Sequence, residues 1–169
     1  SVTPDGSVIY TEQHPVTGND LWKLAPDGKP APLRVTPRNE GGGTVSPDGR
    51  WLAYMSDESG RSEVYVQRYP DAASTTAVSA GGGAYPKWSQ DSRELFYVGG
   101  EAIMVASMAP DGSFGAPRRL FDHSSFMFDF RQPYIRTPYD ISLDGKRLLM
   151  IHRDEGSVPR QLNVILNWS

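Results

Sequence analysis

A hydroxyl-Xaa-Asp corner followed by a short apolar run occurs four times in this chain and constrains its fold more than any other feature. The four copies read TPDGSVIYT (3–11), SPDGRWLAYMS (46–56), SQDSRELFYVG (89–99) and SLDGKRLLMIH (142–152). Their aspartates, Asp5, Asp48, Asp91 and Asp144, are spaced by 43, 43 and 53 residues. A polar loop and a second apolar strand follow each copy. A period of about 40–45 residues with four short strands is typical of β-propeller blades.

The corner itself is predicted to be a structural turn. Pro47 suits the second position of a type I turn, Asp48 tolerates the third, and Gly49 adopts the left-handed conformation that closes a hairpin. The third copy has Gln90 and Ser92 in place of the proline and the glycine, yet the hydroxyl and the aspartate persist in all four copies. A catalytic residue is needed once, whereas a turn is needed in every blade. We therefore interpret Asp5, Asp48, Asp91 and Asp144 as structural turn residues.

The strands that follow the corners are apolar on both faces. In residues 51–55, Trp51, Ala53 and Met55 share one face and Leu52 and Tyr54 share the other. An antiparallel sheet needs two apolar faces only when both are covered, as they are between neighbouring blades. We expect three tryptophans to lie between blades: Trp22, Trp51 and Trp88.

The whole chain, residues 1–169, is predicted to be an all-β partial propeller of about four blades of four-stranded antiparallel sheet. The blade repeats lie near 3–44, 45–83, 84–121 and 138–168, and an insert spans 122–138. The expected strands number three, four, four and three, so the first blade lacks its innermost strand and the last lacks its outermost one. Because unpaired edges are an aggregation liability, we expect either a larger ring with blades ahead of this segment or edge-to-edge pairing of two copies.

Composition excludes several classes of function. The 169 residues suit one domain, and the net charge of −3 arises from interspersed acidic and basic residues. The cluster of Arg118, Arg119, Arg131 and Arg136 is too sparse to follow a phosphate backbone, so no nucleic-acid partner is expected. The absence of cysteine excludes disulfides and thiolate metal sites. No apolar run approaches the roughly 20 residues that cross a bilayer, so no membrane insertion is expected.

Several segments in order resemble a known family. They are TPRNEGG, SPDGRWLAYMSDESGRSEVYV, GGGAYPKWSQDSRELFYV, RRLFD, YDISLDGKRLLMI and LNVILNW. Together they resemble the TolB-like, WD-repeat-like propeller, and more narrowly the C-terminal propeller of many bacterial eukaryotic-type serine/threonine kinases. The resemblance implies a periplasmic or otherwise extracytoplasmic, non-enzymatic domain that binds or senses a protein or small-molecule ligand. Any kinase would lie elsewhere, because no kinase motif occurs here. The insert at 122–138 departs from the family pattern.

The loops on one rim of the propeller are the first candidate binding surface. Connections between the second and third strands share a rim with the links between blades, and function on rigid scaffolds usually lies on such loops. The alternative is a plain solvated rim. The candidate partner-binding residues there are Glu40, Asp57, Glu58, Arg61, Arg153 and Asp154.

The insert is the second candidate. It places aromatic side chains beside arginine, a composition that is enriched in protein contact patches. The alternative is a loop whose aromatic side chains fold over the rim or plug the channel. Its candidate residues are Phe126, Phe128, Phe130, Arg131, Tyr134 and Arg136.

Catalytic and cofactor signals are weak in this sequence. Nothing matches HExxH or GxSxG, and no cofactor or metal is expected. The glycine triplets 41–43 and 81–83 precede strands rather than helices, so they favour close backbone packing over a phosphate site. Two enzymatic alternatives stay open: the gating propeller of a prolyl-oligopeptidase-type peptidase, and a propeller lyase or glycosidase.

Overall fold

A computed structural model describes residues 1–71, 74–122, 139–151 and 162–166. These residues form fourteen strands and no α-helix, and therefore contain no helix that could span a membrane. The strands are β1 (Val8–His14), β2 (Gly18–Leu24), β3 (Pro30–Arg34), β4 (Glu40–Val45), β5 (Trp51–Ser56), β6 (Glu63–Arg68), β7 (Thr75–Ala77), β8 (Ala84–Trp88), β9 (Glu94–Gly99), β10 (Ala102–Ser107), β11 (Arg118–Asp122), β12 (Tyr139–Ile141), β13 (Arg147–Ile151) and β14 (Leu162–Leu166).

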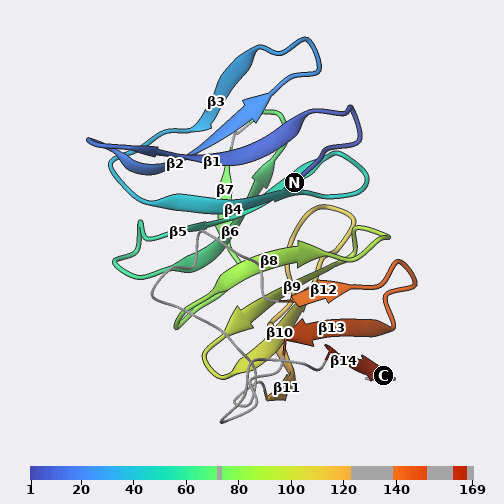
Figure 1. The fold of residues 1–169 in the computed structure, drawn as a ribbon. Coiled ribbons are helices and arrows are strands. Elements are labelled where there is room, and N and C mark those ends of the chain that lie inside the picture. The colour runs from blue at the N-terminus through green and yellow to red at the C-terminus, as the bar shows by residue number, and fades with distance from the viewer. Residues whose placement is uncertain (72–73, 123–138, 152–161, 167–169) are drawn as a thin grey trace.

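The strands form four antiparallel sheets in chain order. The sheets are β1-β2-β3, β4-β5-β6-β7, β8-β9-β10-β11 and β12-β13-β14, which we call blades 1 to 4. Figure 1 shows them following one another from the blue N-terminal sheet to the red C-terminal one. Within the described parts of the chain, the strands number three, four, four and three, as the repeat predicts. The fold is a partial β-propeller.

Each corner is held by its hydroxyl and its aspartate. Ser46 Oγ donates to Asp48 Oδ1 at 2.5 Å, and the amide of Arg50 donates to the same oxygen at 3.1 Å. The amide of Trp51 donates to Ser46 Oγ at 3.0 Å. The corners at Asp5, Asp91 and Asp144 repeat the hydroxyl-to-carboxylate bond. This network uses turn amides that a ladder leaves unpaired, which is why the hydroxyl and the aspartate recur.

The apolar core lies between blades. Leu52 and Tyr54 pack with Ile9 and Leu21 of blade 1, while Trp51 packs with residues of blade 3. A further cluster joins blade 3 to blade 4 through Phe96, Tyr139 and Leu148. Trp51 and Trp88 are each 8% exposed, in agreement with the sequence prediction. Trp22 is only half-buried, because it lies on the face of blade 1 that no described sheet covers, so its place between blades stays a prediction.

The corner of blade 1 is one residue shorter than the other corners. Val2 bridges Val8 in blade 1, whereas Val45 pairs with Leu52 in blade 2. In blade 1 the amide of Thr3 bonds to the carbonyl of Ser7, four residues on. The corresponding amide of Ser46 bonds five residues on, to Trp51. The structural equivalent of Leu52 is therefore Val8, one position earlier than an alignment on the aspartates indicates.

Candidate functional site

The hairpins β1–β2, β5–β6 and β9–β10 share one rim with the links from β3 to β4 and from β7 to β8; we call it the hairpin rim. Of the residues predicted there, Glu40, Asp57 and Glu58 come together, whereas Arg61 lies apart at the next junction between blades. Arg153 and Asp154 lie outside the described residues. So do the predicted residues of the insert, Phe126, Phe128, Phe130, Arg131, Tyr134 and Arg136.

The residues that come together form a cluster at the junction of blades 1 and 2. Glu40 is the first residue of β4, and Asp57 and Glu58 directly follow β5. The structure adds Asp20 from β2 and Arg34 from the end of β3, both of which sequence reasoning missed. We call Asp20, Arg34, Glu40, Asp57 and Glu58 the seam cluster. It contains four carboxylates and one guanidinium.

Arg34 lies between two of the carboxylates. Its Nη2 is 2.6 Å from Glu58 Oε2, and its Nε is 3.8 Å from Glu40 Oε1. The guanidinium carbon also lies 5.2 Å from the centre of the Tyr54 ring, a cation–π distance. The side chains of Arg34 and Glu58 are 22% and 31% exposed, so this ion pair is the solvent-facing edge of the cluster.

Asn39 fixes the loop after β5 against the link between the blades. Its amide nitrogen and its side-chain Nδ2 donate to the two carboxylate oxygens of Asp57, at 2.9 Å and 2.8 Å. Its Oδ1 accepts from the amide of Asn19 at 3.2 Å. Asp57 is thus held in place by backbone and side-chain donors from the link between blades 1 and 2.

Two carboxylate oxygens in the cluster are buried without a hydrogen-bond partner: Glu40 Oε2 and Asp20 Oδ1. Glu40 is fully buried and Asp20 is 2% exposed. The other oxygen of Glu40 accepts from Thr36 Oγ1 at 2.5 Å. Burial raises the pKa of Glu40; the Thr36 hydrogen bond and Arg34 oppose this shift, while Asp20 and Asp57 add to it. Arg34 Nε is likewise buried without a hydrogen-bond partner. Since unpaired buried polar groups are costly, Glu40 Oε2 and Asp20 Oδ1 give the cluster room for a further donor.

The junction of blades 2 and 3 also contains a buried carboxylate, but there both carboxylate oxygens have hydrogen-bond donors. Glu63 is the first residue of β6. In the strand register it occupies the same position in blade 2 that Asp20 of β2 occupies in blade 1. Its Oε1 accepts from the amides of Gly81 and Gly82 at 2.9 Å and 2.8 Å, and its Oε2 accepts from the Ser79 hydroxyl. Arg61 Nε lies 3.0 Å from Glu63 Oε1, which is where the structure places this predicted rim residue. Glu63 therefore secures the glycine link, and both of its carboxylate oxygens have hydrogen-bond donors.

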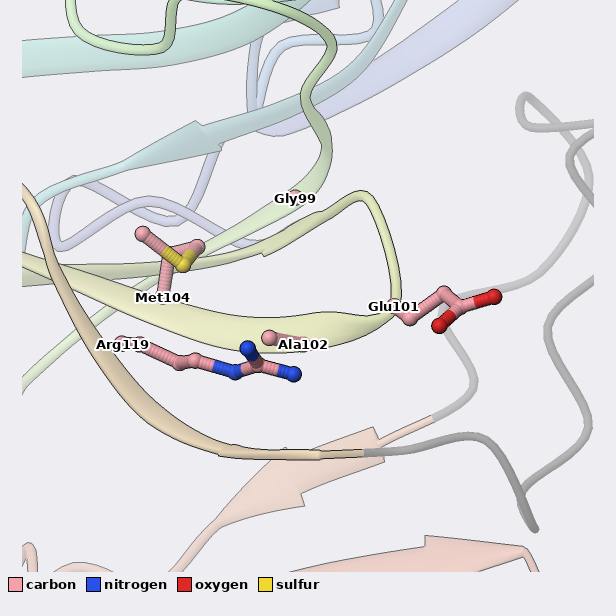
Figure 2. Close-up of a pocket in the computed structure, with 5 residues that line it drawn as sticks. All are labelled: Gly99, Glu101, Ala102, Met104 and Arg119. Atoms are coloured by element: carbon pink, nitrogen blue, oxygen red, sulfur yellow. The ribbon is translucent and has the colours of Figure 1, made fainter.

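Blade 3 carries a shallow pocket beside the same rim, of about 390 Å³. Figure 2 shows its lining residues, Gly99, Glu101, Ala102, Met104 and Arg119, with the Glu101 carboxylate directed away from Arg119. Arg119 forms an ion pair with Asp122. The pocket's charged groups are solvated or paired, so the seam cluster is the stronger candidate. In the described part of the chain, no three His, Cys, Asp or Glu side chains are placed to hold a metal ion.

No family model and no curated protein sequence matches this chain. Among solved structures, a protein assigned as TolB in Agrobacterium tumefaciens aligns with 72% of this chain and 47% of its own, at 25% identity and a TM-score of 0.59. TolB from Acinetobacter baumannii aligns with 94% of this chain and 49% of its own, at 18% identity and a TM-score of 0.54. A puromycin-hydrolysing peptidase from Mycobacterium tuberculosis aligns with 90% and 27%, at 20% identity and a TM-score of 0.63.

These structural neighbours confirm the resemblance to TolB and TolB-like propellers that the sequence indicated. The chain spans about half the length of the two TolB structures. Enzymes also occur among the neighbours, as the peptidase shows. The expected link to a serine/threonine kinase stays a prediction.

Proposed function

We propose that residues 1–169 are a non-catalytic binding module and that the seam cluster receives a basic side chain of a protein partner. One observation carries the proposal: four carboxylates are gathered around a single guanidinium that pairs with only two of them, and two of their buried oxygens have no partner. A lysine or arginine from a partner would supply the missing donors and reduce the surplus of negative charge. Charge-assisted hydrogen bonds of this kind are stronger than neutral ones.

The exposed edge of the cluster gives such a side chain a route of approach. Arg34, Asp57 and Glu58 are the partly exposed members, while Glu40 and Asp20 are buried. An incoming basic group would bind Glu58 and Asp57 first and share Glu58 with Arg34. The loops that present these acids are held by rigid strands and by Asn39, so little ordering cost accompanies binding.

The test uses a tripeptide, acetyl-Ala-Arg-Ala-amide, as the probe, titrated by NMR into the 169-residue chain at low salt. We expect saturable shifts at the amides of residues 57 and 58, and at least a fivefold loss of affinity in the Asp57→Asn/Glu58→Gln double variant. Asp27→Asn is the matched control, because Asp27 lies in the β2–β3 turn on the opposite rim. An unchanged affinity in the double variant, or equal binding of acetyl-Ala-Glu-Ala-amide, would contradict the proposal.

The pH dependence of probe binding is a second readout. A bound cation stabilises the ionised form of Glu40. At a pH at which Glu40 is protonated in the free module, binding therefore releases a proton. Affinity should therefore rise with pH through the raised pKa of Glu40 and then level off. Glu40→Gln keeps the shape of the side chain and should abolish that rise. If the affinity of the Glu40→Gln variant still rises with pH, a group other than Glu40 causes the pH dependence.

The module is proposed to act outside the cytoplasm, in line with its TolB-like fold. A fusion of the parent protein to alkaline phosphatase, which is active only after export, tests this directly. The second candidate function is the gating propeller of a serine peptidase, which the similarity to the mycobacterial peptidase favours. It requires an α/β-hydrolase sequence with a GxSxG motif in the parent gene.

A further inference from the structure

One face of blade 1 is uncovered. Val8 and Tyr10 of β1 pair in register with Leu24 and Trp22 of β2, so all four side chains lie on the same face of the sheet. We call these four residues the open face. Val8 is 39% exposed and Leu24 is 38% exposed, and Tyr10 and Trp22 are half-buried. Figure 1 shows the β1–β3 sheet at one end of the row of sheets.

The two β1 positions of the open face, those of Val8 and Tyr10, are buried in every other blade. The equivalents of Val8 are Leu52, Leu95 and Leu148, each 0% exposed. The equivalents of Tyr10 are Tyr54, Tyr97 and Met150, which are 0%, 3% and 1% exposed. In each case the residue packs on the opposite face of the preceding sheet. The open face thus has the composition of an inter-blade surface without the blade.

We propose that the open face is covered by one further propeller blade, supplied by a longer polypeptide of which residues 1–169 are part. This inference is independent of the seam cluster. It rests on continuity with three observed junctions, in which the covering face is apolar: aliphatic or small in blades 1 and 2, and Phe96 with aliphatic residues in blade 3. At the junction of blades 2 and 3, for example, Ala53, Val64 and Val66 cover Leu95 and Tyr97. The chain's share of the TolB structures, about half, leaves room for such a blade.

The outer strand of blade 1 favours packing on the face over pairing at the edge. β3 contains Pro30 and Pro32, which lack an amide hydrogen and so cannot donate to an added strand. Prolines at sheet edges are a common protection against strand addition. Exposed apolar side chains beside such an edge are stabilised when another sheet packs face to face on them and removes them from water.

The test uses the absence of cysteine from residues 1–169. Leu24→Cys places a thiol on the open face, and Val16→Cys places one on the β1–β2 hairpin, where Val16 is 83% exposed. Each variant is made in the natural full-length protein and in the 169-residue chain. Maleimide labelling rates are read from the modified peptides by mass spectrometry. Val16→Cys reports ordinary solvent access, and circular dichroism shows that each variant retains its sheet.

We expect the Leu24→Cys thiol to label at least 100-fold more slowly than the Val16→Cys thiol in the full-length protein, and within tenfold of it in the 169-residue chain. Comparable rates for the two thiols in the full-length protein would overturn the proposal. So would protection in the 169-residue chain together with a dimer by sedimentation that Trp22→Glu dissociates, because the occupant would then be a second copy. A natural coding region with no blade ahead of residue 1 would overturn it as well.

Discussion

The aspartates at the corners are held ionised by their own turns. The Ser89 hydrogen bond is the main cause that lowers the pKa of Asp91, and the Ser142 hydrogen bond does the same for Asp144. For Asp48, burial opposes ionisation, but the hydrogen bonds from Ser46 and Arg50 outweigh it and the pKa is still lowered. The hydrogen bonds of each corner join a hydroxyl, an aspartate and amides within five residues of one another. Because these bonds are local, the sequence alone predicts the corner.

These shifts give the protein a defined acid sensitivity. A carboxyl with a pKa lower in the folded than in the unfolded chain stabilises the fold fully above its unfolded pKa of about 3.9, and this contribution is lost as the pH falls through the folded pKa. Asp91→Asn should remove the contribution of Asp91 to this pH-dependent stability. The free energy of unfolding of the variant should therefore decline less than that of the wild type between pH 4 and pH 2.5. Urea melts at pH 7, 4 and 2.5 measure this. An identical decline in both proteins would contradict the assignment.

Ser92 takes the place of the turn glycine in the third corner and is strained there, with φ at 62°. Its hydroxyl oxygen accepts a hydrogen bond from the amide of Asp48 at 3.0 Å, and this bond links two neighbouring corners. Ser92→Ala should keep the strain and lose the bond, at a cost of about 1–2 kcal/mol. Ser92→Gly should lose the bond but relieve the strain, and should be about 1 kcal/mol more stable than Ser92→Ala. Equal stabilities in urea would show that no strain is present.

Glycines in or directly before the first strand of each complete blade lie close to neighbouring side chains. A Cβ at Gly43 would lie 2.9 Å from Ile9 Cγ2 and 3.0 Å from Leu21 Cδ2, across the junction with blade 1. A Cβ at Gly83 would lie 2.3 Å from Ser79 Oγ. The sequence prediction that these glycines serve close packing is therefore confirmed at both positions. Gly81 and Gly82 face open space and serve conformation instead, with φ at 98° and 114°.

Gly43→Ala should consequently separate blades 1 and 2. Overpacking of this kind costs about 1–3 kcal/mol, and the loss should appear as a lower urea midpoint in fluorescence-monitored unfolding. Gly115→Ala is the matched control, because its nearest contact would be at 3.8 Å and no unusual φ is needed there. A midpoint unchanged in Gly43→Ala, or lowered equally in both variants, would refute the close-packing argument.

At the scale of the whole molecule, polar bonds cross the apolar junctions between sheets. Tyr139 Oη donates to the carbonyl of Tyr85 at 2.7 Å and joins blade 4 to blade 3. Trp88 Nε1 donates to the carbonyl of Thr44 at 3.1 Å and joins blade 3 to blade 2. Since each blade contacts its neighbours in the chain, a junction that is weakened should loosen the blade beyond it.

Tyr139→Phe removes the bond between blades 3 and 4 without changing the apolar volume of the side chain. We expect a loss of about 1–2 kcal/mol in the free energy of unfolding, and faster hydrogen exchange at the amides of β13 than at those of β5. Tyr10→Phe on the open face is the control and should change neither quantity. Uniform acceleration in all blades would indicate that the molecule opens only as a single unit.

The sequence by itself determined the strands, the corners and their number, because a turn and an alternating strand depend on a few neighbouring residues. It also pointed to Glu40, Asp57 and Glu58 on one rim. Only the tertiary structure decided that these acids meet Asp20 and Arg34, and that Tyr10 rather than Thr11 matches Tyr54. Both facts depend on strand register and on which sheets lie side by side, and contacts between residues distant in the chain set these.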